Sequence, residues 1–298
     1  MGGVFFLRIG LALSGGGIRG AVHIGVLKAL EENGIIPNYI SGTSSGSIIA
    51  SLYSVGLNSH EIEELFKNNA KNMILDFDFS ELFMYVKSLM LNLHKNIDGF
   101  IKGDRIKKVL SDTFNYRGCV HIKQMGIPVA IPAVDINTSK MVMFVSDKKN
   151  LLDKDDVIYD DDIDVATAVR ASISMPVIFR PCNVKGRKLV DGGIKNSIPV
   201  EVLRQMGADK VLAVNLGYAG KVVPDIDNVL EIAFQAIDIM SYQISKPIVK
   251  QADYVLLPEV YDVKLLEVSR ISECIERGYE ATIKKMPNIK MALGIANG

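Results

Sequence analysis

Three short segments of this chain combine residue types and spacings that suit acyl transfer. The first is the glycine-rich turn SGGGIRG at residues 14–20, the second is GTSSG at residues 42–46, and the third is DGG at residues 191–193. The second segment has the G-x-S-x-G form of a nucleophile elbow, which exposes a serine on a sharp strand-to-helix turn. The first offers backbone N–H groups at the start of a helix, where they suit an oxyanion. Together the segments indicate a serine nucleophile, an oxyanion hole and a carboxylate.

Ser44 is the predicted nucleophile. A serine hydroxyl attacks poorly until a base removes its proton. Gly42 and Gly46 let the chain turn sharply and let the following helix approach the sheet, so that the helix N-terminus lies beside the reacting carbon. The G-x-S-x-G pattern alone is weak, because small residues also fill tight helix–sheet contacts, but its position between a strand and a helix strengthens it. Ser45 falls one position late in the motif and is expected to supply a backbone N–H.

The glycine-rich turn has competing interpretations. The G-x-G-x-x-G spacing at residues 15–20 satisfies a dinucleotide fingerprint, which requires an acidic residue about 20 positions on, at the end of the next strand. That strand ends in the serine turn instead, so we favour an oxyanion hole built from the N–H groups of Gly15, Gly16 and Gly17, with that of Ser45. A tight turn without a ligand is the structural alternative.

Two further residues of this turn support the motif. Gly20 completes it, and Arg19 lies on the first turn of the following helix. The arginine is expected to anchor the loop or to bind a phosphate head group, with a solvated side chain as the alternative.

Asp191 is the predicted base. No histidine follows it in the chain, so the Ser, acid, His order of α/β-hydrolases is impossible with this acid. His23 is expected to be a packed helix histidine. An aspartate has an unperturbed pKa near 3.9 and is a poor base in water, but burial raises that value. Gly192 and Gly193 allow close approach, although an isolated Asp-Gly-Gly is more often a hairpin turn.

Composition limits the classes of partner. The 298 residues are 48% hydrophobic, and Lys plus Arg and Asp plus Glu both number 34. Because the net charge is zero, no basic field exists to hold nucleic acid. The mean hydropathy of +0.21 indicates a large buried sheet or some exposed apolar surface. Any peripheral membrane contact is therefore expected to be apolar and local, and nothing in the sequence indicates an oligomeric state.

Three widely spaced cysteines fit neither a disulfide framework nor a zinc motif, which favours a reducing, cytoplasmic compartment. Residues 1–13 are interpreted as leading into the first strand rather than as a signal peptide, and no run of 18 uninterrupted apolar residues predicts a transmembrane helix. The acidic run at residues 153–164 lacks the glycine and the final glutamate of a calcium loop. We favour a solvated loop there, with Asp164 or a neighbour capping the next helix.

Alternating strands and helices predict an α/β fold, a three-layer α/β/α arrangement with a mainly parallel central sheet, as one domain over residues 1–298. Residues 73–101, rich in Met and Phe, are interpreted as a lid, as the lining of an acyl channel, or as core. Expected strands are residues 8–13, 40–42, 127–134, 140–145, 188–190, 210–216 and 254–257. Expected helices are residues 19–33, 45–55, 103–114, 165–174, 227–245 and 269–285.

The three motifs, in this order, resemble those of the patatin-like phospholipase family, which combines G-G-G-x-[R/K]-G, G-x-S-x-G and D-G-[G/A]. Residues 170–181 (RASISMPVIFRP) and 191–199 (DGGIKNSIP) are also similar to segments of that family. The resemblance covers about residues 11–205, and residues 206–298 are expected to continue the same fold.

By this resemblance the chain hydrolyses lipid acyl esters through a Ser44–Asp191 dyad, with a lipid or phospholipid substrate and without metal or organic cofactor. Two other classes stay open at this point: a lipid-binding pseudoenzyme or scaffold with an unreactive Ser44, and a nucleotide-binding protein that uses the glycine-rich turn.

Overall fold

The computed structural model describes residues 7–74, 99–217, 220, 226 and 229–296. Its strands are β1 (Ile9–Leu13), β2 (Tyr39–Gly42), β3 (Val129–Asp135), β4 (Met141–Val145), β5 (Val157–Asp160), β6 (Cys182–Val184), β7 (Arg187–Asp191), β8 (Lys210–Val214) and β9 (Tyr254–Leu256). Its α-helices are α1 (Val22–Glu32), α2 (Ser45–Ser54), α3 (Ser59–Ile74), α5 (Asp104–Tyr116), α6 (Val165–Ser172), α7 (Val200–Met206), α8 (Val229–Val249) and α9 (Ile271–Leu293). Short 3-10 turns include η1 (Gly17–Ala21) and η3 (Gly192–Ile194).

The strands form one mainly parallel sheet, as predicted. Its order is β5-β4-β3-β2-β1-β8-β9, and β7, with β6 beside it, joins at β3. β1 lies between β2 and β8 and is parallel to both. The pairs β2–β3, β4–β5 and β8–β9 are also parallel, whereas β3–β4, β3–β7 and β6–β7 are antiparallel.

One edge of β3 is shared by two strands. Ala130 pairs with β2 and Ala133 pairs with β7, while both residues also pair with β4. Because a strand has only two edges, β2 and β7 must lie on the edge opposite β4. β2 runs parallel to β3 and β7 runs antiparallel to it, so the C-terminal ends of β2 and β7 point toward each other.

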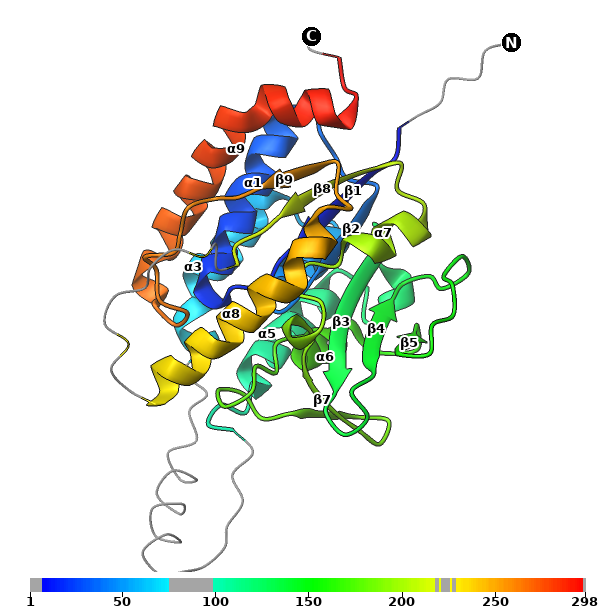
Figure 1. Ribbon diagram of the computed structural model, residues 1–298, viewed down its shortest axis with the longest axis vertical. Helices are drawn as coiled ribbons and strands as arrows, with labels where there is room; N and C mark the ends of the chain where they lie inside the picture. Colours follow the sequence, from blue (N-terminus) through cyan, green and yellow to red (C-terminus); the bar gives the residue numbers. More distant parts are fainter. Residues whose placement is uncertain (1–6, 75–98, 218–219, 221–225, 227–228, 297–298) are drawn as a thin grey trace, which may run out of the picture.

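Two apolar cores cover the two faces of the sheet. Leu11 and Leu13 of β1 pack into the first core with α1, α2, α3, α5, α6 and α9. Ala12, between them, faces the second core with α7 and the last turn of α8. This alternation is the period of two expected of a strand that is covered on both faces. In Figure 1, α8 crosses in front of the sheet, and the predicted three-layer arrangement is visible.

The first and last helices of the fold contact each other through their backbones. α1 and α9 lie side by side (Figure 1). A Cβ atom at Gly25 would lie 1.9 Å from the carbonyl oxygen of Ile275, and one at Gly278 would lie 2.2 Å from that of Val22. Each helix therefore needs a glycine where its partner's backbone approaches.

Parts of the structure differ from the sequence-based expectations. The pattern does not predict α3, α7 or β5, and β5 lies inside the acidic run that was expected to be a solvated loop. Asp160 of β5 is buried and accepts hydrogen bonds from the Lys185 ammonium at 2.9 Å. Asp164 does cap α6, since its Oδ1 accepts the Thr167 N–H at 3.1 Å. Residues 75–98, most of the expected lid or channel segment, lie outside the described residues.

Across the described ranges, the structure contains no helix that is both long enough and apolar enough to span a membrane. In the same ranges, no group of three or more His, Cys, Asp or Glu side chains is arranged to hold a metal ion.

We expect Gly278→Ala to lower the free energy of unfolding by about 2 kcal/mol or more, because the added methyl group forces α9 away from α1. Urea denaturation followed by circular dichroism measures the change. Glu276→Ala, an exposed change on the same helix, is the control and should alter stability by less than about 0.5 kcal/mol. Equal stability of the two variants would contradict the close contact.

Candidate active site

Ser44 lies on the sharp turn between β2 and α2. Its backbone has φ 53° and ψ −124°, a conformation that costs a non-glycine residue roughly 1–3 kcal/mol. A Cβ at Gly46 would lie 2.5 Å from the carbonyl oxygen of Leu13, and one at Gly42 would lie 2.2 Å from that of Gly46. Both glycines are therefore required for the helix to start so close to the end of β1. The turn has the geometry of a nucleophile elbow, and its serine is only partly buried.

Asp191 ends β7 and faces Ser44. Its Oδ1 accepts the Gly193 N–H at 2.7 Å, and the Ser44 hydroxyl lies close enough to lower the pKa of the carboxyl group. The residue is 6% exposed. Burial raises the pKa of Asp191 from 3.8 to about 6, although the Ser44 hydroxyl and the Gly193 N–H both lower it. The carboxylate is therefore ionised at neutral pH and is a much stronger base than an exposed aspartate.

The sheet explains why these two residues meet. Ser44 follows the C-terminal end of β2 by two residues, and Asp191 is the last residue of β7. Since β2 and β7 approach each other along the same edge of β3, the turn after one strand lies at the end of the other. Gly192 continues the chain past this point, where a Cβ would lie 2.4 Å from the carbonyl oxygen of Pro132.

The glycine-rich turn lies against Ser44. A Cβ at Gly15 would lie 3.1 Å from the Ser44 Cβ, but the Gly15 N–H donates to the carbonyl oxygen of Ser197 at 3.2 Å. Within the described residues, no acceptor is found for the N–H groups of Gly16, Gly17 and Ser45. Of the four N–H groups expected to bind an oxyanion, that of Gly15 is therefore engaged by the protein itself, within the residues that the structure describes.

Ser14 and His23 fix the start of this turn. The Ser14 carbonyl accepts the His23 Nε2–H at 2.8 Å, and its hydroxyl accepts the Leu216 N–H at 2.8 Å. His23 is fully buried, and burial lowers its pKa to about 4, so the ring is neutral at physiological pH. With Nε2 bonded to Ser14 and Nδ1 unpartnered within the described structure, His23 is a packed helix histidine.

Arg19 anchors the other end of the turn. Its Nε donates to the carbonyl oxygen of Val263 at 2.7 Å, which joins the glycine-rich turn to the segment before α9. This contact agrees with the loop-anchoring interpretation. Gly20 packs against Ser45, whose Oγ would lie 2.4 Å from a Cβ at that position.

Neither acid near the expected ribose position faces the glycine-rich turn. Glu31 and Glu32 both lie on α1. Glu31 accepts the Ser59 N–H at 3.1 Å, and Glu32 accepts the Tyr279 hydroxyl at 2.7 Å. The position at the end of β2, where a dinucleotide-binding protein carries its ribose acid, holds the serine turn.

Ser172 contacts Ser44 and Ser174 contacts Asp191, although the sequence pattern alone indicates no role for either serine. The Ser172 Oγ accepts the Ser44 N–H at 3.0 Å, and the Ser174 carbonyl accepts the Asp191 N–H at 2.9 Å. Both serines belong to residues 170–181, one of the segments that carried the family resemblance. The similarity of residues 170–181 to a segment of that family was the available sign that these serines belong to the site, because no local sequence pattern links Ser172 to Ser44.

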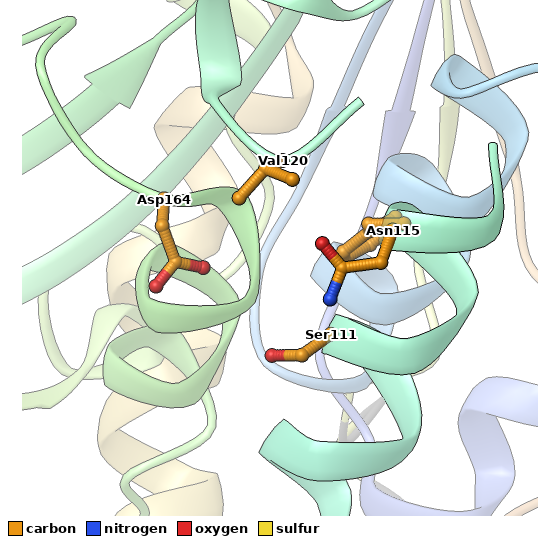
Figure 2. A pocket seen from close by; sticks show the side chains of 5 residues that line it. Ser111, Asn115, Val120 and Asp164 are labelled. Atoms are coloured by element: carbon orange, nitrogen blue, oxygen red, sulfur yellow. The ribbon is translucent and has the colours of Figure 1, made fainter. Parts of the chain in front are cut away.

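A cavity of about 110 Å³ lies away from these residues, between α5 and the start of α6. Figure 2 shows Ser111 and Asn115 of α5 across this hollow from Val120 and Asp164. Asp164 caps the N-terminal end of α6, whereas the contact with Ser44 is at the C-terminal end, about 12 Å away for an eight-residue helix. The cavity therefore does not adjoin Ser44.

The sheet thus places a serine, on a strained strand-to-helix turn, beside a buried carboxylate at the end of another strand. The family model described as "Patatin-like phospholipase" matches residues 11–204, and the chain belongs to that family.

Curated relatives share about a third of their aligned residues with this chain. An uncharacterised NTE family protein of Mycobacterium tuberculosis is 30% identical over 211 residues, which cover 70% of this chain and 49% of the relative. Human patatin-like phospholipase domain-containing protein 6 is also 30% identical over 211 residues, but only 13% of that protein is covered. The chain thus spans half or less of the length of these relatives.

Among solved structures, human GIVD cytosolic phospholipase A2 has a similar fold. The TM-score is 0.51 at 12% sequence identity, and the match covers 97% of this chain and 60% of that one. At this identity the likeness concerns the fold.

We expect Asp191→Asn to stabilise the protein at pH 8 by up to about 3 kcal/mol. The folded-state pKa of Asp191 lies above its unfolded value, so burying the carboxylate costs stability as the pH rises from about 4 through 6. Below pH 4 both states are protonated and the difference should vanish. Urea denaturation of both proteins at pH 4 and pH 8 measures it. The control is Asp135→Asn, another buried aspartate; an equal pH-dependent gain there would contradict the assignment to Asp191.

Proposed function

We propose that this protein is a serine hydrolase of lipid acyl esters, with Ser44 as nucleophile and Asp191 as general base. The observation that carries the proposal is the position of Ser44, on its strained turn, beside a buried carboxylate whose pKa is raised to about 6. Membership of a phospholipase family supports a lipid or phospholipid as the substrate.

In the first half of the reaction, the Ser44 Oγ forms a bond to the ester carbonyl carbon while its proton passes to Asp191. The carbonyl oxygen becomes an oxyanion, and the N–H groups of Gly16, Gly17 and Ser45 are the donors that we propose stabilise it. The C–O bond to the leaving alcohol then breaks, and the alcohol departs with the proton from Asp191. An acyl-Ser44 ester remains.

In the second half, a water molecule attacks the acyl carbon and gives its proton to Asp191. The second tetrahedral intermediate collapses, the Ser44 Oγ leaves and recovers the proton, and the fatty acid is released. Asp191 thus acts as base and then as acid in each half. The α2 N-terminus adds a positive dipole end beside the reacting carbon in both.

A peripheral contact with lipid is part of this proposal. α8 contacts η3, immediately after Asp191. It exposes Ile232, Ile239 and Met240, which recur at helical spacing on one face. This face suits the apolar, local contact that a chain of zero net charge is expected to make.

An alkyl fluorophosphonate tests the nucleophile and the base, because its P–F bond breaks and fluoride leaves as the serine oxygen bonds to phosphorus. We expect labelling of the wild type, none of Ser44→Ala, and labelling of Asp191→Asn at least about a hundredfold more slowly. Ser51→Ala and Asp135→Asn, which alter a buried serine and a buried aspartate elsewhere, should react like the wild type. A wild type that stays unlabelled with detergent-dispersed lipid present would reject the hydrolase and favour a lipid-binding protein.

The rate of hydrolysis of a p-nitrophenyl acyl ester should depend on the ionisation of Asp191. Only the ionised carboxylate accepts a proton, so kcat/KM should fall as the pH falls through about 6 and level off above pH 7. Stopped assays from pH 4.5 to pH 8 measure the profile. A midpoint near 4, the value of an exposed aspartate, would show that Asp191 is not the titrating base.

A further inference from the structure

The backbone N–H of Ser44 has an unusual acceptor. Two neighbouring amides bond within the turn itself: the Gly46 N–H donates to the Thr43 carbonyl and the Ser47 N–H to the Ser44 carbonyl. The Ser44 N–H instead donates to the Ser172 Oγ at 3.0 Å, across 128 positions of sequence. Ser172 is fully buried and is the last residue of α6.

This hydrogen bond acts on the most strained residue of the site. The peptide of Ser44 relaxes toward ordinary backbone conformations unless its surroundings hold it at φ 53°. Rotation about that φ moves the side chain, and with it the Oγ, relative to the Asp191 carboxylate. An acceptor fixed in the core beneath the turn resists this rotation, because releasing the N–H would leave it without a partner.

The same turn of chain also holds the base. The Ser174 carbonyl accepts the Asp191 N–H at 2.9 Å. Arg170, itself buried, fastens this turn: its guanidinium donates to the Ser174 Oγ at 2.6 Å and to the Arg180 carbonyl at 2.8 Å. One short segment therefore sets the position of Ser44 and of Asp191 relative to each other.

We infer that Ser172 is a positioning residue, which holds the nucleophile by accepting the backbone N–H of Ser44. This role rests on the proposed function of Ser44 and Asp191. Ser172 does not touch the substrate, and it transfers no proton; it sets the geometry in which the Oγ reaches the carboxylate and the acyl carbon together.

The rate of labelling by an alkyl fluorophosphonate, measured together with its end-point, tests this role. We expect Ser172→Ala to react about ten- to a hundredfold more slowly than the wild type, yet to reach one label per chain. With a p-nitrophenyl acyl ester, kcat should fall by a similar factor while KM changes little. Ser172→Thr keeps the hydroxyl acceptor and should restore most of the rate. Ser51→Ala, another fully buried serine whose hydroxyl donates to the Ile48 carbonyl at 2.9 Å, is the matched control.

The pH profile separates positioning from proton transfer. Because the surroundings of the Asp191 carboxylate are unchanged, the midpoint near pH 6 should be the same in Ser172→Ala and in the wild type. Should the alanine variant not fold, Ser172→Cys replaces the hydroxyl with a weaker acceptor, and the same comparison of rate and end-point applies.

Several outcomes would overturn the inference. Wild-type rates in Ser172→Ala would show that the hydrogen bond has no effect on the nucleophile. A lowered end-point, or a rate that threonine does not restore, would show a general loss of folded protein instead. A shifted pH midpoint would show a direct effect on the base. Each of these leaves Ser44 reactive in the wild type, whereas an unreactive wild type would reject the proposed function itself.

Discussion

Two strands share one edge of β3, and the position of the candidate site depends on that sharing. β2 occupies the first part of the edge and β7 the last part, with opposite directions. A parallel sheet brings the C-terminal ends of neighbouring strands to the same side, but it does not make two ends face each other. The antiparallel β7 does so. A residue just past β2 and the last residue of β7 then lie within hydrogen-bonding reach, without a long loop to carry either of them.

Two features of the site cost folding free energy, and the stability of the surrounding fold offsets that cost. Ser44 is held in a strained backbone conformation, and Asp191 keeps a carboxylate away from water. Both lie on elements of the packed fold: the strained turn joins a buried strand to a buried helix, and the carboxylate ends β7, which pairs with β3 and contacts α6. The apolar packing on both sheet faces is what makes such local costs tolerable.

Local patterns were sufficient for much of this structure. The buried strands, the helix that follows each glycine turn, and the α/β class follow from apolar periodicity and from glycine at turns. The pattern missed α3 and the short α7, and it interpreted the acidic run around β5 as loop. There a lysine at position 185, distant in sequence, neutralises Asp160.

Part of the candidate site could likewise be predicted from the sequence, and part could not. Ser44 and Asp191 were predicted from their motifs, and the structure brings them together. The engagement of the Gly15 N–H by Ser197, and the contact of Ser172 with Ser44, depend on which segments meet in space. Ser172 is the last residue of the short helix α6, and Ser174 follows that helix. Serines at such positions are common, so their residue type alone does not indicate a role in the site. The packing of α6 against α2, β3 and β7 brings that region to the nucleophile.

The central position of β1 has a consequence for the way the chain is made. β1 is bonded on one side to β2, which follows within the first 42 residues, and on the other side to β8, about 200 residues later. At roughly 5–20 residues per second, a ribosome needs on the order of ten seconds or more to deliver β8. During that interval the newly made β1 presents an open, apolar edge, which is a template for pairing with another chain. The sheet therefore closes around β1 only after synthesis has passed residue 214.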